Sequence, residues 1–147
     1  MINYFKSAER TLSERANLEK ALANLERRKD RLLRKGTPSD NVLSDYARPY
    51  ISGGGANAVL SDMLDLAEIA KEIELTKETI EEIDDVLAQL EQTDADLLRA
   101  WYIEHKSKEE IAERINYSSS STIYDLRNKA VAAFAVLYFG AGALAST

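Results

Sequence analysis

The sequence has little that would support a disulfide, a thiolate metal site or a membrane span. Among its 147 residues there is no cysteine, one histidine and two prolines, so neither a disulfide framework nor a thiolate metal site can form. The longest apolar stretch, residues 130–145, is interrupted by two glycines and is shorter than the about 20 residues that span a bilayer. The first six residues lack the features of a signal peptide. These absences favour a soluble, cytoplasmic protein with no membrane partner.

Charge is distributed unevenly along the chain. The net charge is −6, but residues 1–36 hold 10 Lys and Arg against 5 Asp and Glu, whereas residues 37–92 hold 3 against 13. Residues 93–147 are nearly balanced, with 6 against 7. An acidic protein is an unusual ligand for nucleic acid. The segregation of charge instead suggests that the basic segment and the acidic segment lie side by side in the fold.

Two long helices are predicted in the first part of the chain, over about 3–35 and 57–92. Apolar residues recur at helical spacing in the first, at Leu18, Leu22, Leu25 and Leu32. In the second, alternating spacings of four and three define a seam through Val59, Met63, Leu66, Ala70, Ile73, Lys77 and Ile80. The segment between them contains both prolines and three consecutive glycines, which predicts a flexible linker. We therefore expect residues 1–92 to form a long antiparallel, coiled-coil-like helical hairpin.

Residues 93–147 are predicted to form a second domain with three helices and an apolar C-terminal tail. Thr93 and Ser107 are each followed three residues later by an acidic residue, as at helix N-termini. Ile111 and Ile115 are expected to face inward on a short helix, and Ile123 to anchor the next helix against it. Short joints between such helices are typical of a helix-turn-helix. The predicted fold is thus all-α, a helical hairpin followed by a helix-turn-helix domain.

This second domain resembles a known DNA-binding family. The stretch LRAWYIEHKS at 98–107, followed by EEIAE at 109–113 and by the Tyr-Ser and Ser-Thr-Ile-Tyr sequences around the serine run, is similar to region 4 of bacterial sigma factors. More closely, it resembles the sigma-like helix-turn-helix of phage late-transcription regulators of the ArpU and RinA type, over about residues 93–138. Two departures are visible. Ser119 and Ser120 both stand where the family usually has one residue, and Asp125 occupies a position that is often basic.

The resemblance implies which residues would contact DNA. Mapped onto this sequence, the candidates for the groove lie on the first turns and one side of the last helix, and they are Ser119, Ser120, Ser121, Tyr124 and Asn128. The candidates for backbone phosphate are the nearby cations, for which charge matters more than exact geometry, and they are Lys106, Lys108, Arg114, Arg127 and Lys129.

The resemblance also implies a function. We expect a sequence-specific DNA-binding transcriptional regulator, encoded by a phage or prophage, that acts on late genes in the cytoplasm of a bacterial host cell. Its partners would be double-stranded DNA and a second copy of the chain, with host RNA polymerase as a further candidate. The alternative is an assembly or interaction protein, such as a packaging-site recognition subunit or a polymerase-binding factor, whose working surface is the coiled coil. A helix-turn-helix can also serve as a protein-contact unit, and this domain lacks the usual basic footprint.

Two further expectations concern the tail and catalysis. The tail segment from Val131 to Phe139 is apolar on all sides of a helix, so it is expected either to mediate self-association or to pack back against the hairpin. Catalysis finds little support, because the single histidine, His105, has no evident nucleophile as a partner. The carboxylates of residues 62–91 follow helical surface spacing without forming a ligand set. We therefore expect no enzymatic activity, no metal and no cofactor.

Overall fold

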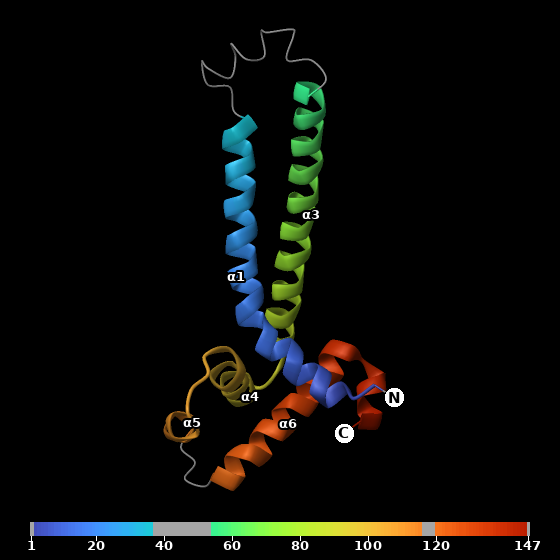
Figure 1. Cartoon of the computed structure of the whole chain (residues 1–147). Helices are drawn as coiled ribbons and strands as arrows, with labels where there is room; N and C mark the ends of the chain where they lie inside the picture. The colour runs from blue at the N-terminus through green and yellow to red at the C-terminus, as the bar shows by residue number, and fades with distance from the viewer. Residues whose placement is uncertain (1, 37–53, 116–119, 147) are drawn as a thin grey trace. The chain divides into compact units, whose positions relative to one another are not determined.

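All regular secondary structure in the part of the chain that the structure describes is helical. The computed structural model describes residues 2–36, 54–115 and 120–146, and no strand occurs within these ranges (Figure 1). The elements in chain order are α1 (Tyr4–Gly36), α3 (Gly54–Gln89), α4 (Gln92–Leu98), the π-helical turn η1 (Arg99–Ile103), α5 (Lys108–Ile115), α6 (Ser120–Phe139) and the 3-10 turn η2 (Ala141–Ser146). The predicted all-α fold class is confirmed. None of the described helices is both long and apolar enough to cross a membrane.

The element boundaries lie close to the predicted ones. Helix α1 matches the expected 3–35 within one residue at each end. Helix α3 begins at Gly54 and ends at Gln89, three residues before each of the expected positions. The predicted linker falls mostly on residues 37–53, which lie outside the described residues.

The chain divides into two compact units. One, here called the core unit, comprises Met1–Glu19 and Glu78–Thr147, and the other, the paired-helix unit, comprises Lys20–Lys77. This division differs from the predicted boundary after residue 92. The physical reason is that the first turns of α1 and the last turns of α3 contribute side chains to the same hydrophobic core as α6.

The largest hydrophobic cluster lies in the core unit. Ala8 and Leu12 of α1 and Ile83 and Leu87 of α3 are fully buried in it together with Phe134 of α6. The other members of the cluster are Val86, Leu98, Tyr102, Ala130, Val131, Ala135 and Ala143. Within the same unit, the Arg15 guanidinium donates to both carboxylate oxygens of Asp84, at 2.6 and 2.7 Å, and this ion pair raises the pKa of Arg15.

The apolar tail packs back against the first turns of α1, as one of the two expectations predicted. Val131, Phe134 and Ala135 are completely buried within the chain. The ring of Phe139 lies 5.5 Å from that of Tyr4, centroid to centroid, so the end of α6 packs against the start of α1. One side of the tail is therefore buried against the rest of the core unit.

In the paired-helix unit, α1 and α3 lie side by side and run antiparallel (Figure 1). Two ion pairs set the register: Lys35 Nζ lies 3.5 Å from Asp62, and Lys77 Nζ lies 4.0 Å from Glu26. As residue numbers rise along one helix they fall along the other, which defines the direction. The predicted seam is wrong at Met63, which is 63% exposed. The neighbouring Asp62 is less exposed, at 32%, and its carboxylate pairs with Lys35.

We expect alanine substitutions at Phe134 and Leu137 to differ in their effect on the free energy of unfolding. Phe134 is fully buried and Leu137, three residues later on α6, is 45% exposed. Phe134→Ala should lower the free energy of unfolding by about 3–5 kcal/mol because it leaves a cavity, whereas Leu137→Ala should lower it by less than about 1 kcal/mol. Urea denaturation followed by circular dichroism measures both. Equal losses would contradict the packing of α6 described above.

Candidate nucleic-acid interface

A second, smaller hydrophobic cluster fixes the helices that carry the predicted site. Leu97 of α4, Ala100 of η1, Ile111 of α5 and Ile123 of α6 are each at most 1% exposed and pack together. Trp101, Ala112, Ile115 and Leu126 lie partly buried around them. The predicted burial of Ile111 and Ile123 is confirmed. Because each helix contributes to one shared cluster, the angle between α5 and α6 is set by side-chain packing.

The turns on either side of this cluster have identifiable local causes. Ser107 Oγ accepts a hydrogen bond from the backbone N–H of Glu110 at 3.2 Å, so it caps α5 as predicted. The predicted cap at Thr93 is wrong, because α4 begins two residues earlier than expected, and Glu91 occupies the N-cap position without a side-chain cap. His105 has φ of +54°, a left-handed conformation that ends the preceding helix. The N–H of Lys106 then donates to the carbonyl of Ala100 at 2.8 Å.

Arg127, a predicted phosphate contact, is held inside the core unit. Its side chain is only 18% exposed, and Nη1 lies 3.7 Å from the carboxylate of Glu9 on α1. The guanidinium carbon lies 4.8 Å from the centroid of the Trp101 ring, over its face, and 5.5 Å from that of Tyr124. Such a stacked, ion-paired guanidinium is largely committed to the fold. Helix α6 is thus tied to the first turns of α1 through a charged contact as well as through the apolar core.

Tyr102 completes this network. Its hydroxyl donates a 2.7 Å hydrogen bond to Glu9 Oε2 and lies 3.5 Å from Arg127 Nη1. Burial raises the pKa of Tyr102, and the hydrogen bond to Glu9 raises it further, while the positive charge of Arg127 acts in the opposite direction. The side chain is 6% exposed, which fits its predicted place in the core.

Arg127 also orients Asn128, a predicted groove contact. The Arg127 Nε–H donates to Asn128 Oδ1 at 2.9 Å, and Asn128 itself is exposed. With its amide oxygen already accepting this bond, Asn128 offers chiefly its NH₂ donors to a ligand.

Tyr124 lies at the border between the core and the surface. The Lys108 ammonium lies 4.5 Å from the centroid of the Tyr124 ring, within cation–π distance. The ring packs edge-on against Trp101, with 5.4 Å between centroids. Tyr124 therefore fixes Lys108 of α5 beside α6, and only part of its ring remains for contact with a ligand.

The remaining predicted contacts differ in how far they are neutralised. Arg114 pairs with Glu104 at 3.0 Å, and Lys106 lies 3.9 Å from Glu110. Lys129 is exposed and forms no ion pair within 4 Å in the described parts of the chain. Burial raises the pKa of the nearby Asp94. The positive charge of Lys129 acts in the opposite direction and is the smaller influence.

The serine run is only partly visible. Ser119 lies outside the described residues, and for Ser120 and Ser121 only their place at the start of α6 is described.

The described residues bring together one side of α6 with one flank of α5. Asp125, Asn128 and Lys129 are exposed on α6, and Lys108 with Tyr124 lies at its edge. Sequence periodicity did not reveal the contribution of Glu9, because this residue is 93 positions away from its partner Tyr102. In the described ranges, no three His, Asp or Glu side chains gather closely enough to hold a metal ion.

The network predicts a specific dependence of stability on pH. Because the folded-state pKa of Tyr102 is raised, its stabilising contribution is present below its ordinary pKa of about 10 and is lost as the pH rises beyond it. Tyr102→Phe should lower the free energy of unfolding by about 1–2 kcal/mol at pH 8, and the difference from the unsubstituted protein should shrink towards pH 11. Urea denaturation at several pH values tests this. A difference that stays constant with pH would show that the hydroxyl is not held in this way.

No protein-family model, curated protein or solved structure is significantly similar to the chain, so the interpretation of this surface depends on its own residues.

Proposed function

We propose that α4, α5 and α6 form a helix-turn-helix domain that binds double-stranded DNA through the exposed side of α6. The observation that carries this proposal is the shared cluster around Ile111 and Ile123, which holds a short helix and a longer helix together. Three polar residues of the longer helix, Asp125, Asn128 and Lys129, are exposed. This is the arrangement that places a recognition helix in a major groove. The antiparallel α1 and α3 would form the helical hairpin that precedes it.

The proposed biological role follows from the family resemblance of residues 93–138. On that basis the protein is a sequence-specific transcriptional regulator of a phage or prophage that acts on late genes. Its DNA contacts would come from α6, and its hairpin would serve assembly or contact with RNA polymerase. The role is inferred from the resemblance, and the exposed face of α6 is the surface to which DNA would bind.

Electrostatics narrows the set of phosphate contacts. Of the five predicted cations, Lys106 and Arg114 have carboxylate partners, and Arg127 is paired and stacked inside the fold. Lys108 and Lys129 have no carboxylate within 4 Å among the described residues. We therefore assign the main phosphate contacts to these two lysines. A footprint with so few free cations implies that binding depends strongly on base contacts and weakly on salt.

Asn128 is the best-placed reader of bases on the described part of α6. Because Arg127 occupies its amide oxygen, Asn128 would donate through its NH₂ group to an acceptor in the major groove. Guanine N7 and O6 and thymine O4 are such acceptors. Arg127 would act through Asn128 as a positioning residue, without touching DNA itself.

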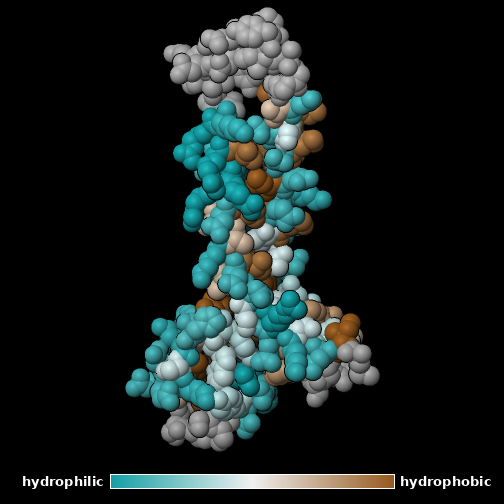
Figure 2. All heavy atoms as spheres, in the orientation of Figure 1, coloured by the Kyte–Doolittle hydropathy of each residue, from teal (hydrophilic) through white to brown (hydrophobic). Residues whose placement is uncertain are grey.

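A second candidate is an interaction protein that uses the paired helices, and one observation favours it. Leu60, Met63 and Leu64 are 56%, 63% and 59% exposed on α3, and Figure 2 shows hydrophobic side chains along this helix. Exposed apolar side chains this close together often mark a protein contact. Such a protein would bind its partner with full affinity in the absence of DNA.

Reversal of the two unpaired lysines tests the proposed DNA contact. Once a binding site has been selected from a random DNA pool with the full chain, Lys108→Glu with Lys129→Glu should weaken binding at least about tenfold. The slope of log affinity against log salt should fall by about 2. The matched control is Lys6→Glu with Arg10→Glu, two exposed cations of α1 in the same unit, and it should retain the affinity. If no site can be selected, or if both double variants bind equally, the proposed surface is wrong.

Asn128→Asp tests the assignment of base reading separately from phosphate contact. The substitution replaces two donors by acceptors, so one position of the selected site should change towards cytosine, whose N4 amino group donates. A second selection from the random pool reads this change directly. Loss of affinity at every position without a change in base preference would instead place Asn128 on the backbone.

A further inference from the structure

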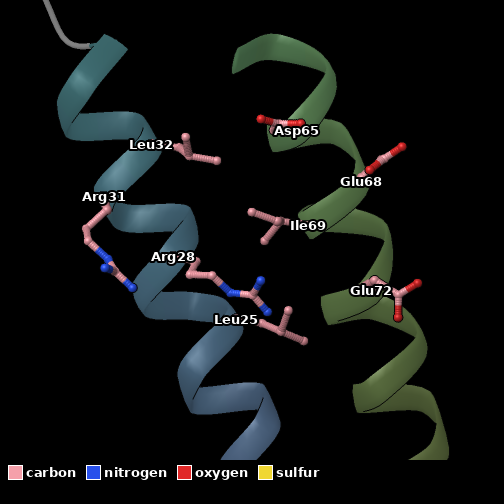
Figure 3. Close-up of a pocket in the computed structure, with 8 residues that line it drawn as sticks. All are labelled: Leu25, Arg28, Arg31, Leu32, Asp65, Glu68, Ile69 and Glu72. Carbon is pink, nitrogen blue, oxygen red and sulfur yellow. The ribbon is translucent and has the colours of Figure 1, made fainter. Parts of the chain in front are cut away.

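A groove between α1 and α3 in the paired-helix unit has an apolar floor. Leu25 and Leu32 of α1 and Ile69 of α3 point into the space between the two helices (Figure 3). The groove has a volume of about 540 Å³. All three side chains remain partly exposed to water.

This unit buries very little of its own apolar surface. Among the described residues of Lys20–Lys77, Ile73 is the only buried residue, and it is 4% exposed. Two helices can cover only one narrow stripe of each other, and bundles of helices normally need a further layer to enclose a core. Covering the floor of the groove would therefore remove apolar surface from water, which is favourable.

The two rims of the groove carry opposite charges. Arg28 and Arg31 line it on α1, and Asp65, Glu68 and Glu72 line it on α3. All five side chains are exposed. Within the described ranges none of them forms an ion pair within 4 Å, although Lys35–Asp62 and Lys77–Glu26 do so in the same unit. In an antiparallel pair the numbers of facing residues have a nearly constant sum, and the two ion pairs give 97 and 103. Their mean places Arg28 level with Glu72, and Arg31 about level with Glu68.

We propose that two copies of the chain associate face to face through this groove, with α1 of each copy lying antiparallel to α3 of the other. A two-fold axis along the groove places the basic rim of one copy over the acidic rim of the other. It also keeps each residue at its own height, so Arg28 of the second copy meets Glu72 and its Arg31 meets Glu68. The product is a four-helix bundle whose core includes Leu25, Leu32 and Ile69 of both copies.

The charge pattern selects this arrangement over the other face-to-face symmetry. A two-fold axis across the helices would place α1 over α1 and α3 over α3, so that basic residues meet basic ones and acidic residues meet acidic ones. Interfaces of this kind are disfavoured by like-charge contacts. For a groove with one basic and one acidic rim, only the two-fold axis along the groove brings rims of opposite charge together.

Charge reversal with mixing tests this interface. In sedimentation experiments with the full chain, Arg28→Glu with Arg31→Glu, and separately Glu68→Arg with Glu72→Arg, should each weaken dimerisation about 100-fold, since four attractive pairs become repulsive. An equimolar mixture of the two variants should associate again, to within about tenfold of the unsubstituted chain. Recovery on mixing depends only on contacts between chains, because charge repulsion within each chain is unchanged.

The matched control reverses two other cations of α1. Arg27→Glu with Arg34→Glu makes the same change in net charge at exposed positions that do not line the groove, and it should leave dimerisation nearly unchanged. Should circular dichroism show that a reversal unfolds the chain, Arg28→Gln with Arg31→Gln must still weaken the dimer. A monomeric unsubstituted chain at about 100 μM, where a weak dimer would still form, overturns the proposal. So does an unweakened reversed variant, or a mixture that stays dissociated.

Discussion

The packing of the first turns of α1 against α6 is the constraint on which the core unit depends. Ala8 and Leu12 contribute to the same buried cluster as Phe134, and Glu9 on the same stretch of α1 accepts the hydrogen bond of Tyr102 and pairs with Arg127. Apolar burial supplies most of the stabilisation. The charged network determines how the elements are oriented, because the carboxylate of α1, the hydroxyl of η1 and the guanidinium of α6 meet only when these three elements are in register. The orientation of α6, and of everything on its exposed side, follows from this contact.

The same network changes the meaning of the cations near the predicted interface. A guanidinium that stacks on Trp101 and pairs with Glu9 stabilises the fold and orients Asn128, whereas a lysine without a carboxylate partner remains available to an anion. Counting basic residues in this segment would therefore overestimate its capacity for phosphate. The arrangement favours a ligand that is recognised by a few directional hydrogen bonds over one that is bound by charge alone.

The segregation of charge along the chain has two physical roles. In the paired-helix unit it supports antiparallel pairing through Lys35 with Asp62 and Lys77 with Glu26. The residues that these pairs leave over form the rims of the groove at Arg28, Arg31, Glu68 and Glu72. Each exposed pair contributes little on its own. A repeated pattern of such pairs nevertheless distinguishes one orientation of neighbouring helices from another, since the wrong orientation brings like charges together.

The sequence by itself determined the helices, the cap at Ser107 and the burial of Ile111 and Ile123, because periodicity and local hydrogen bonding act between residues a few positions apart. It also predicted that the last helix would begin within the serine run, and α6 begins at Ser120. Only the tertiary structure decided that the tail packs on α1, that Met63 leaves the seam and that Arg127 turns inward to Glu9. Two of these contacts join residues far apart in the chain, 118 positions for Arg127 with Glu9 and 135 positions for Phe139 with Tyr4, and no spacing in the sequence encodes such contacts.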